Sequence, residues 1–316
     1  MKSRILQGML SLVLVSVLTL PAHAFWETAA ASSAAQTANR APTAAAVEGE
    51  TYPDVMIELP LSATDPDGDA VLLKLDTPPS HGTASISSGT LQYTPTETGT
   101  DRFTYLAIDT FGNASEPAEI TVHVTRNKAK LTYSDMNHNA AHYAALQLAA
   151  KGVMTGEQVG TAYFFHPDEP VTRSEFIAMT AALAGLPIEE TTQTDFADDS
   201  GLSDWAKPYI SAAAAGGLVS GYPTASGACE IRGQNPITLA EACVMLRGLL
   251  GDSSASVQTA ALDVSYAPAW AQDACAVLTS ADILPESMVR TNSGQALTRE
   301  EACLLLYRTA LQIENL

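Results

Sequence analysis

The pentapeptide Val171-Thr172-Arg173-Ser174-Glu175 occurs in three related versions along the chain. The other two are Ile237-Thr238-Leu239-Ala240-Glu241 and Leu297-Thr298-Arg299-Glu300-Glu301. In each version a Thr precedes a Glu by three residues. This is the spacing of a capping box, in which each of the two side chains accepts a hydrogen bond from the other residue's backbone N–H. An apolar stripe at helical spacing follows each pentapeptide. The three pentapeptides therefore predict three helices that begin beside Thr172, Thr238 and Thr298.

Other landmarks recur with the pentapeptides, so a whole segment is repeated. The matching positions are Asp135, Asp198 and Asp263, then Val153, Leu218 and Ile283, each set in chain order. A repeat of this length indicates helical units that stack or are related by symmetry, because one unit cannot bury its apolar face alone. We predict three helical repeats, at 131–187, 195–251 and 262–313.

The segment 47–126 has a different pattern, which is typical of β structure. Ile120, Val122 and Val124 alternate with polar residues, as in a strand with one buried face. Turn residues such as Asp67-Gly68 separate several runs of this kind. Six or seven short strands in this length fit a sandwich of immunoglobulin-like size.

The start of the chain predicts export. Lys2 and Arg4 precede an apolar run that ends at Ala24 in an A-x-A pattern, so residues 1–24 resemble a cleaved signal peptide. An uncut membrane anchor is the alternative, although the run is short for a spanning helix. Residues 25–46 are rich in Ala, Ser and Thr and are expected to be a linker.

The charge of the chain excludes two classes of partner. Its 316 residues carry a net charge of −19. Such an acidic chain repels nucleic-acid phosphates and anionic membrane surfaces. We therefore expect no nucleic-acid partner, and no membrane contact after the signal peptide is removed.

Two family resemblances follow from these motifs. Ala63-Thr64-Asp65-Pro66-Asp67-Gly68-Asp69, Tyr93-Thr94-Pro95 and the run from Gly99 to Tyr105 resemble bacterial cadherin-like or immunoglobulin-like repeats. Phe196-Ala197-Asp198, Trp205-Ala206 and the run from Gly217 to Tyr222, with the Thr-x-x-Glu helix starts, resemble S-layer homology domains in three copies. The resemblance implies an N-terminal all-β immunoglobulin-like sandwich, followed by an all-α pseudo-threefold bundle of three helical repeats.

The second resemblance also implies a function and a set of binding residues. S-layer homology domains hold exported proteins to cell-wall secondary polysaccharides, typically pyruvylated ones. Arg173 and Arg299 lie in the first turn of a helix, where a cation opposes the helix dipole, so local stability does not require them. Beside helix N–H groups, a guanidinium binds a carboxylate such as that of a pyruvate ketal. A solvated Arg paired with Glu is the alternative. Leu239 replaces Arg in the second repeat.

Trp205 and Trp270 are the second pair of candidate binding residues. A sugar ring stacks on an indole, whereas a core Trp between helices is the equally weighted alternative. Ala140 holds this position in the first repeat. The Thr and Glu of the three capping boxes (Thr172, Glu175, Thr238, Glu241, Thr298 and Glu301) are expected to be structural.

Asp65, Asp67 and Asp69, with Asp109 further on, raise the question of a calcium site. Clustered carboxylates suit this cation, but an acidic turn around Asp67-Gly68 explains them as well and is the favoured interpretation. We otherwise expect no cofactor.

The four cysteines, Cys229, Cys243, Cys275 and Cys303, lack the spacing of a zinc site. Export permits disulfides in three pairings, while free or partly paired thiols are slightly favoured.

No catalytic motif is present in the sequence, so we expect a non-enzymatic surface protein anchored to wall polysaccharide, with the β domain as a spacer or adhesive module. The alternatives are an adhesin whose β domain binds an external carbohydrate or protein, and a scaffold or accessory subunit for a surface enzyme.

Overall fold

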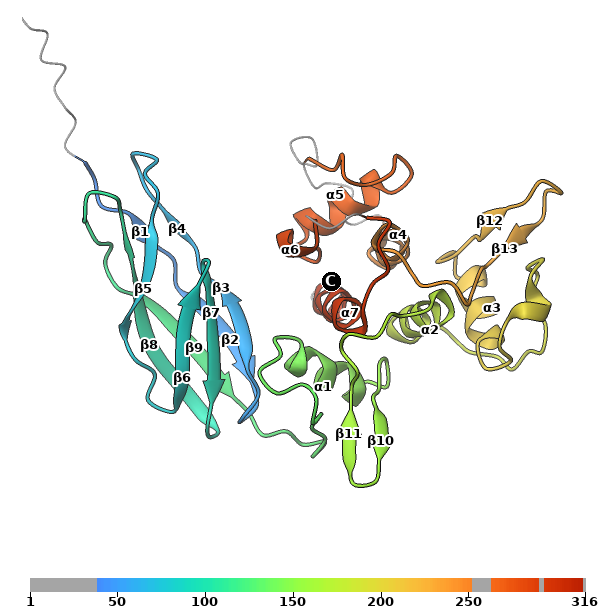
Figure 1. Ribbon diagram of the computed structural model, residues 1–316, viewed down its shortest axis with the longest axis horizontal. Helices are drawn as coiled ribbons and strands as arrows, with labels where there is room; N and C mark the ends of the chain where they lie inside the picture. The colour runs from blue at the N-terminus through green and yellow to red at the C-terminus, as the bar shows by residue number, and fades with distance from the viewer. Residues whose placement is uncertain (1–38, 252–262, 290–292, 315–316) are drawn as a thin grey trace, which may run out of the picture. The chain divides into compact units, whose positions relative to one another are not determined.

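The computed structural model describes residues 39–251, 263–289 and 293–314 (Figure 1). The predicted signal peptide, 1–24, and residues 25–38 of the predicted linker lie outside the described residues. The remainder of that linker contains strand β1 (Thr43–Ala44), which pairs antiparallel with β4 (Ala63–Thr64). β structure thus begins before residue 47.

The β region forms two main sheets from short strands. One has the order β2-β9-β8-β5 and the other β3-β7-β6. The pairing is antiparallel except between β2 and β9, which are parallel. The strands are β1 (Thr43–Ala44), β2 (Val47–Thr51), β3 (Ile57–Pro60), β4 (Ala63–Thr64), β5 (Leu72–Thr77), β6 (Gly82–Ser87), β7 (Thr90–Pro95), β8 (Gly99–Ile108) and β9 (Ala118–Val124).

Alternating residues of these strands form the core of the β region. Tyr93 and Leu91 from one sheet and Tyr105 and Ile120 from the other are completely buried. A buried hydroxyl needs a partner, and the Tyr93 hydroxyl donates a 2.8 Å hydrogen bond to the Asp101 carboxylate. The alternation read from the sequence thus places the apolar faces inward.

Within the described residues the second region contains seven α-helices, one 3-10 helix (η1, Asp199–Gly201) and two small hairpins. The helices are α1 (His142–Ala150), α2 (Arg173–Leu183), α3 (Lys207–Ala215), α4 (Leu239–Leu249), α5 (Gln272–Ser280), α6 (Glu286–Val289) and α7 (Arg299–Glu314). The hairpin strands are β10 (Glu157–Val159) with β11 (Ala162–Phe164), and β12 (Tyr222–Pro223) with β13 (Cys229–Glu230).

The second helix of each repeat packs against the first helix of another repeat. α2, α4 and α7 contact one another, and they also contact α3, α5 and α1 respectively (Figure 1). Each outer helix is therefore held by a neighbouring repeat.

A closed cycle of hydrogen bonds joins the three segments that precede α2, α4 and α7. The N–H of Val171 donates to the carbonyl of Leu297 at 3.0 Å, the N–H of Leu297 to that of Ile237 at 2.9 Å, and the N–H of Ile237 to that of Val171 at 2.8 Å. All three side chains are buried. Every repeat thus satisfies backbone groups of the other two.

The prediction of an all-α bundle for this region is wrong. Hairpins β10-β11 and β12-β13 lie between the two helices of the first and second repeats, so this region is not built from helices alone. Strands of two or three residues are too short to show a period of two in the sequence. The region is a mixed structure of helices and hairpins.

Candidate functional site

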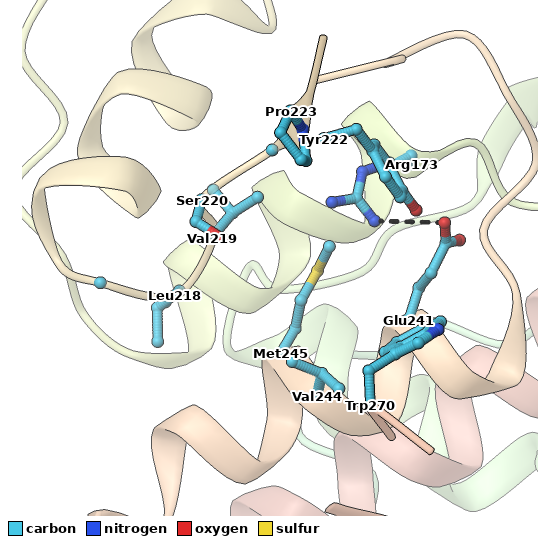
Figure 2. Close-up of a pocket in the computed structure, with 12 residues that line it drawn as sticks. Arg173, Leu218, Val219, Ser220, Tyr222, Pro223, Glu241, Val244, Met245 and Trp270 are labelled. Carbon is cyan, nitrogen blue, oxygen red and sulfur yellow. Dashed lines mark ion pairs between the residues drawn. The ribbon is translucent and has the colours of Figure 1, made fainter. Parts of the chain in front are cut away.

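A pocket of about 450 Å³ lies between the first and second repeats, with Trp270 of the third repeat at its wall. Its other walls are Arg173 at the start of α2, the loop 217–223, and residues of α4 that include Glu241. Figure 2 shows Arg173 and Glu241 pointing toward one another, with Trp270 beside Glu241. We call this the Arg173 pocket.

Arg173 is buried in this pocket, with 6% of its surface exposed. Its Nε donates a 2.9 Å hydrogen bond to the carbonyl of Ile231 in the second repeat. Its Nη1 lies 3.6 Å from Oε1 of Glu241, close enough for an ion pair but too long for a hydrogen bond. Of the five N–H donors of the guanidinium, one therefore has a hydrogen-bond partner among the described residues. Burial lowers the pKa of Arg173, with Glu241 opposing this shift.

The backbone N–H groups at the start of α2 do not face the pocket as free donors. The N–H of Arg173 donates to the carbonyl of Asn235, and that of Ser174 donates to the carbonyl of Gly233. The starts of α4 and α7 are satisfied similarly, with Leu239 bonded to Gln295 and Arg299 to Glu169. The sequence-based picture of open helix N–H groups beside Arg173 therefore does not hold, and the guanidinium itself is the available donor.

The capping-box Glu of α4 has a second role in the pocket. Oε2 of Glu241 accepts from the N–H of Thr238 at 2.9 Å, while Oε1 faces Arg173. The structure shows the same reciprocal bonds between Thr172 and Glu175 and, before α7, between Thr298 and Glu301.

Neither Trp is a core residue. Trp205 is 51% exposed and Trp270 is 59% exposed. Trp270 lies two residues before α5, at the wall of the Arg173 pocket. Trp205 has the same position relative to α3. Such exposed indoles are open to a ligand from solvent.

Arg299 repeats the arrangement of Arg173 at another junction. Its Nε donates to the carbonyl of Phe165 at 2.7 Å, and its Nη2 donates to the carbonyl of Thr155 at 2.9 Å. Arg173 thus reaches from the first repeat to the second, and Arg299 from the third to the first. The remaining junction has Leu239, which is buried.

Two residues of the Arg173 site were not singled out from the sequence. They are Tyr222 and Arg232: the ring of Tyr222 lies close to two guanidinium groups, with Cζ of Arg173 at 4.9 Å and Cζ of Arg232 at 4.5 Å from its centroid. Gly221 positions this Tyr from a left-handed conformation, and a Cβ there would approach the carbonyl of Glu230 to 2.8 Å. The Gly-x-x-x-Gly loop was the only signal for this wall.

The acidic cluster of the β domain is both a turn and a close grouping of carboxylates. Oδ1 of Asp65 accepts from the N–H groups of Asp67 and Asp69, as expected for the predicted turn. One oxygen each of Asp65, Asp69 and Asp109 lies within 4.8 Å of the others. Asp67 is directed elsewhere, into a 2.8 Å ion pair with Arg40. Desolvation and the neighbouring carboxylates raise the pKa of Asp69.

Comparison with known families matches both halves of the chain. Residues 34–126 match the bacterial cadherin-like domain, and residues 132–177 and 195–243 match the S-layer homology domain. The chain combines a bacterial cadherin-like domain with S-layer homology domains. The resemblance drawn from the sequence is thereby confirmed.

Two curated relatives are S-layer proteins. An S-layer protein of Bacillus thuringiensis subsp. finitimus is 35% identical over 74 residues, and S-layer protein sap of Bacillus anthracis is 34% identical over 74 residues. Each match covers 23% of this chain and 8% of the relative. The domains and these relatives indicate an exported surface protein attached to the cell wall.

Solved structures resemble parts of the chain only weakly. An endo-fucoidan hydrolase of glycoside hydrolase family 107 is 22% identical, with a TM-score of 0.25, over 28% of this chain and 14% of that one. Titin domain M7 is 12% identical, with a TM-score of 0.20, over 28% of this chain and 96% of that one. Within the described residues no helix has both the length and the hydropathy needed to cross a bilayer.

Proposed function

We propose that the protein is a non-catalytic surface protein whose grooves between helical repeats bind an anionic wall polysaccharide. The observation that carries the proposal is the Arg173 pocket, where a largely buried guanidinium with unused donors lies near an exposed Trp. A guanidinium forks onto a carboxylate with two charge-assisted hydrogen bonds, and an indole stacks on the apolar face of a sugar. A pyruvylated polysaccharide presents both chemical features.

The net charge of the helical half strengthens the case for a localised cation. Residues 127–316 contain 10 basic and 21 acidic residues, so the overall field repels an anionic polymer. Attraction must therefore come from short-range contacts in a site that excludes water. The Arg173 pocket offers such contacts, because its guanidinium lies at the wall of the pocket and a second guanidinium, that of Arg232, lies near the same Tyr222 ring.

Two of the three junctions between repeats carry the proposed binding residues. By equivalence of position, the second groove combines Arg299, Glu175 and Trp205, because α2 packs against α3 as α4 packs against α5. At the third junction Leu239 takes the place of the Arg, and Ala140, which precedes α1, takes the place of the Trp. We therefore assign binding to two grooves and a packing role to the third junction.

We also propose that 262–313 is a third S-layer homology repeat. α7 begins with the same capping box as α2 and α4, and the segment before it closes the cycle of hydrogen bonds. The β domain, in this proposal, is a spacer or adhesive module.

Replacing an exposed Trp tests the proposal with little risk to folding. Trp270→Ala is expected to weaken co-sedimentation with purified cell walls, because the stacking surface of the Arg173 pocket is lost. Phe111→Ala is the matched control, since Phe111 is an aromatic residue of the β domain that is 71% exposed. Equal sedimentation of both variants and the parent would contradict the role of Trp270. Comparing sedimentation with walls that carry pyruvyl groups and with walls that lack them tests whether the pyruvyl carboxylate is the bound anion.

A further inference from the structure

Two of the four cysteines occupy facing positions on packed helices. Cys243 lies in α4 and Cys275 in α5, both are completely buried, and these helices pack against each other. The two thiols are close enough for each to shift the pKa of the other. Cys303 and Cys229 are placed differently, the first in α7 and the second partly exposed in β13.

The equivalent contacts in the other repeats show that this pair is unusual. Cys243 is the fifth residue after the capping Thr238, where Ile177 and Cys303 stand in α2 and α7. The residues equivalent to Cys275 are Ile210 in α3 and Ala145 in α1. In each of the three helices, the backbone N–H of this residue donates to the carbonyl of the Ala that directly precedes the helix. The contact between α2 and α3 thus has two isoleucines, and the contact between α4 and α5 has two thiols. Two thiols fill less volume than two isoleucines, so a covalent bond would compensate for reduced apolar packing.

We propose that Cys243 and Cys275 form a disulfide bond that ties α4 to α5 in the exported protein. Exported proteins meet conditions in which disulfides form and persist. Two S–H bonds break and one S–S bond forms, and the two electrons and two protons reduce the disulfide of a thiol–disulfide oxidoreductase, or a small-molecule disulfide, to two thiols. The exchange occurs while the chain folds, because both sulfurs are buried afterwards.

The bond would also fix two walls of the Arg173 pocket. Glu241 lies two residues before Cys243 in α4, and Trp270 lies five residues before Cys275. Tying the helices together holds the carboxylate and the indole at a constant separation. This consequence for the pocket rests on the proposed function, whereas the bond itself does not.

Peptide mapping of the full chain tests the bond directly. Cleavage after Arg and Lys, except before Pro, places each cysteine on its own peptide: 174–232, 233–247, 248–290 and 300–308. The protein is exported from a bacterial host, alkylated at once and digested without reductant. We expect 233–247 linked to 248–290, and alkylated Cys229 and Cys303. Recovery of all four cysteines in alkylated form, or a link to either of the other two, would overturn the proposal.

Thermal unfolding provides a second test that does not depend on wall binding. Reductant should lower the unfolding temperature of the parent by roughly 5–10 °C, because the cross-link closes a loop of about thirty residues. The double variant Cys243→Ala/Cys275→Ala should not respond to reductant, while Cys303→Ala should respond like the parent. An equal response of parent and double variant would refute the bond. Lost wall binding with an intact cross-link would instead count against the proposed function.

Discussion

Replacing Arg173 by Leu is the substitution that the structure itself recommends. Leu239 is the residue at the equivalent position of α4, where it is buried and α4 keeps its capping box. At the third junction Leu239 takes the place of the Arg, and Glu301 takes the place of Glu241. Glu301 still accepts the hydrogen bond from the N–H of Thr298, so the capping box does not need the Arg. Arg173→Leu should therefore remove the cation of the pocket and leave the helix start intact, whereas Arg173→Ala would also leave a void.

The expected loss of affinity follows from the donors of the guanidinium. A charge-assisted hydrogen bond contributes about 1.5–3 kcal/mol. Losing one from Arg173 to a carboxylate would weaken binding roughly ten- to a hundredfold. The ion pair with Glu241 is lost too, but that carboxylate keeps its bond to Thr238. The variant should thus lose affinity rather than structure.

Sedimentation with purified walls measures the effect, and circular dichroism checks that helix content is unchanged. Arg173→Leu and Arg299→Leu should each reduce the bound fraction, and the double variant should remain in the supernatant. The reciprocal variant Leu239→Arg should gain little, because Ala140 leaves that junction without an indole. If the folded double variant pellets like the parent, the guanidinium groups do not hold the polymer, and the proposed binding residues are wrong.

Three further predictions concern stability. Millimolar calcium should leave the unfolding temperature of the full chain nearly unchanged, because backbone N–H groups already occupy oxygens of the acidic turn; a large rise would establish a calcium site. Residues 131–190 expressed alone should show no cooperative unfolding transition in calorimetry, because the hydrogen-bonded cycle needs all three repeats. Burial lowers the pKa of His142, so this residue favours folding fully above pH about 6.5, and its contribution is lost as pH falls below that value. His142→Gln should reduce the loss of stability measured between pH 7 and pH 5.

The sequence predicted those parts of the structure that depend on local patterns. The spacing of Thr172 and Glu175 located the start of α2, and the alternation at Ile120 and Val122 located β9. Packing between repeats carries no such local signal. The pairing of α2 with α3, and the stacking of Arg173 and Arg232 on Tyr222, depend on segments that come together only in the folded chain. The short hairpins were missed because strands of two or three residues show no period of two in the sequence, and the all-α prediction was wrong for the same reason.

Apart from Glu241, which serves both the capping box of α4 and the Arg173 pocket, the residues that build the fold differ from those we propose for binding, so one junction can lack the proposed binding residues. The cycle through Val171, Ile237 and Leu297 and the three capping boxes recur at every junction. Arg and Trp occur at two junctions, while Leu239 fills the third with an apolar side chain that packs as well. Because the cycle requires three segments to close, the second repeat is needed for folding even though its own helix start contributes no cation. The anchor we propose thus needs three repeats to fold and two grooves to bind.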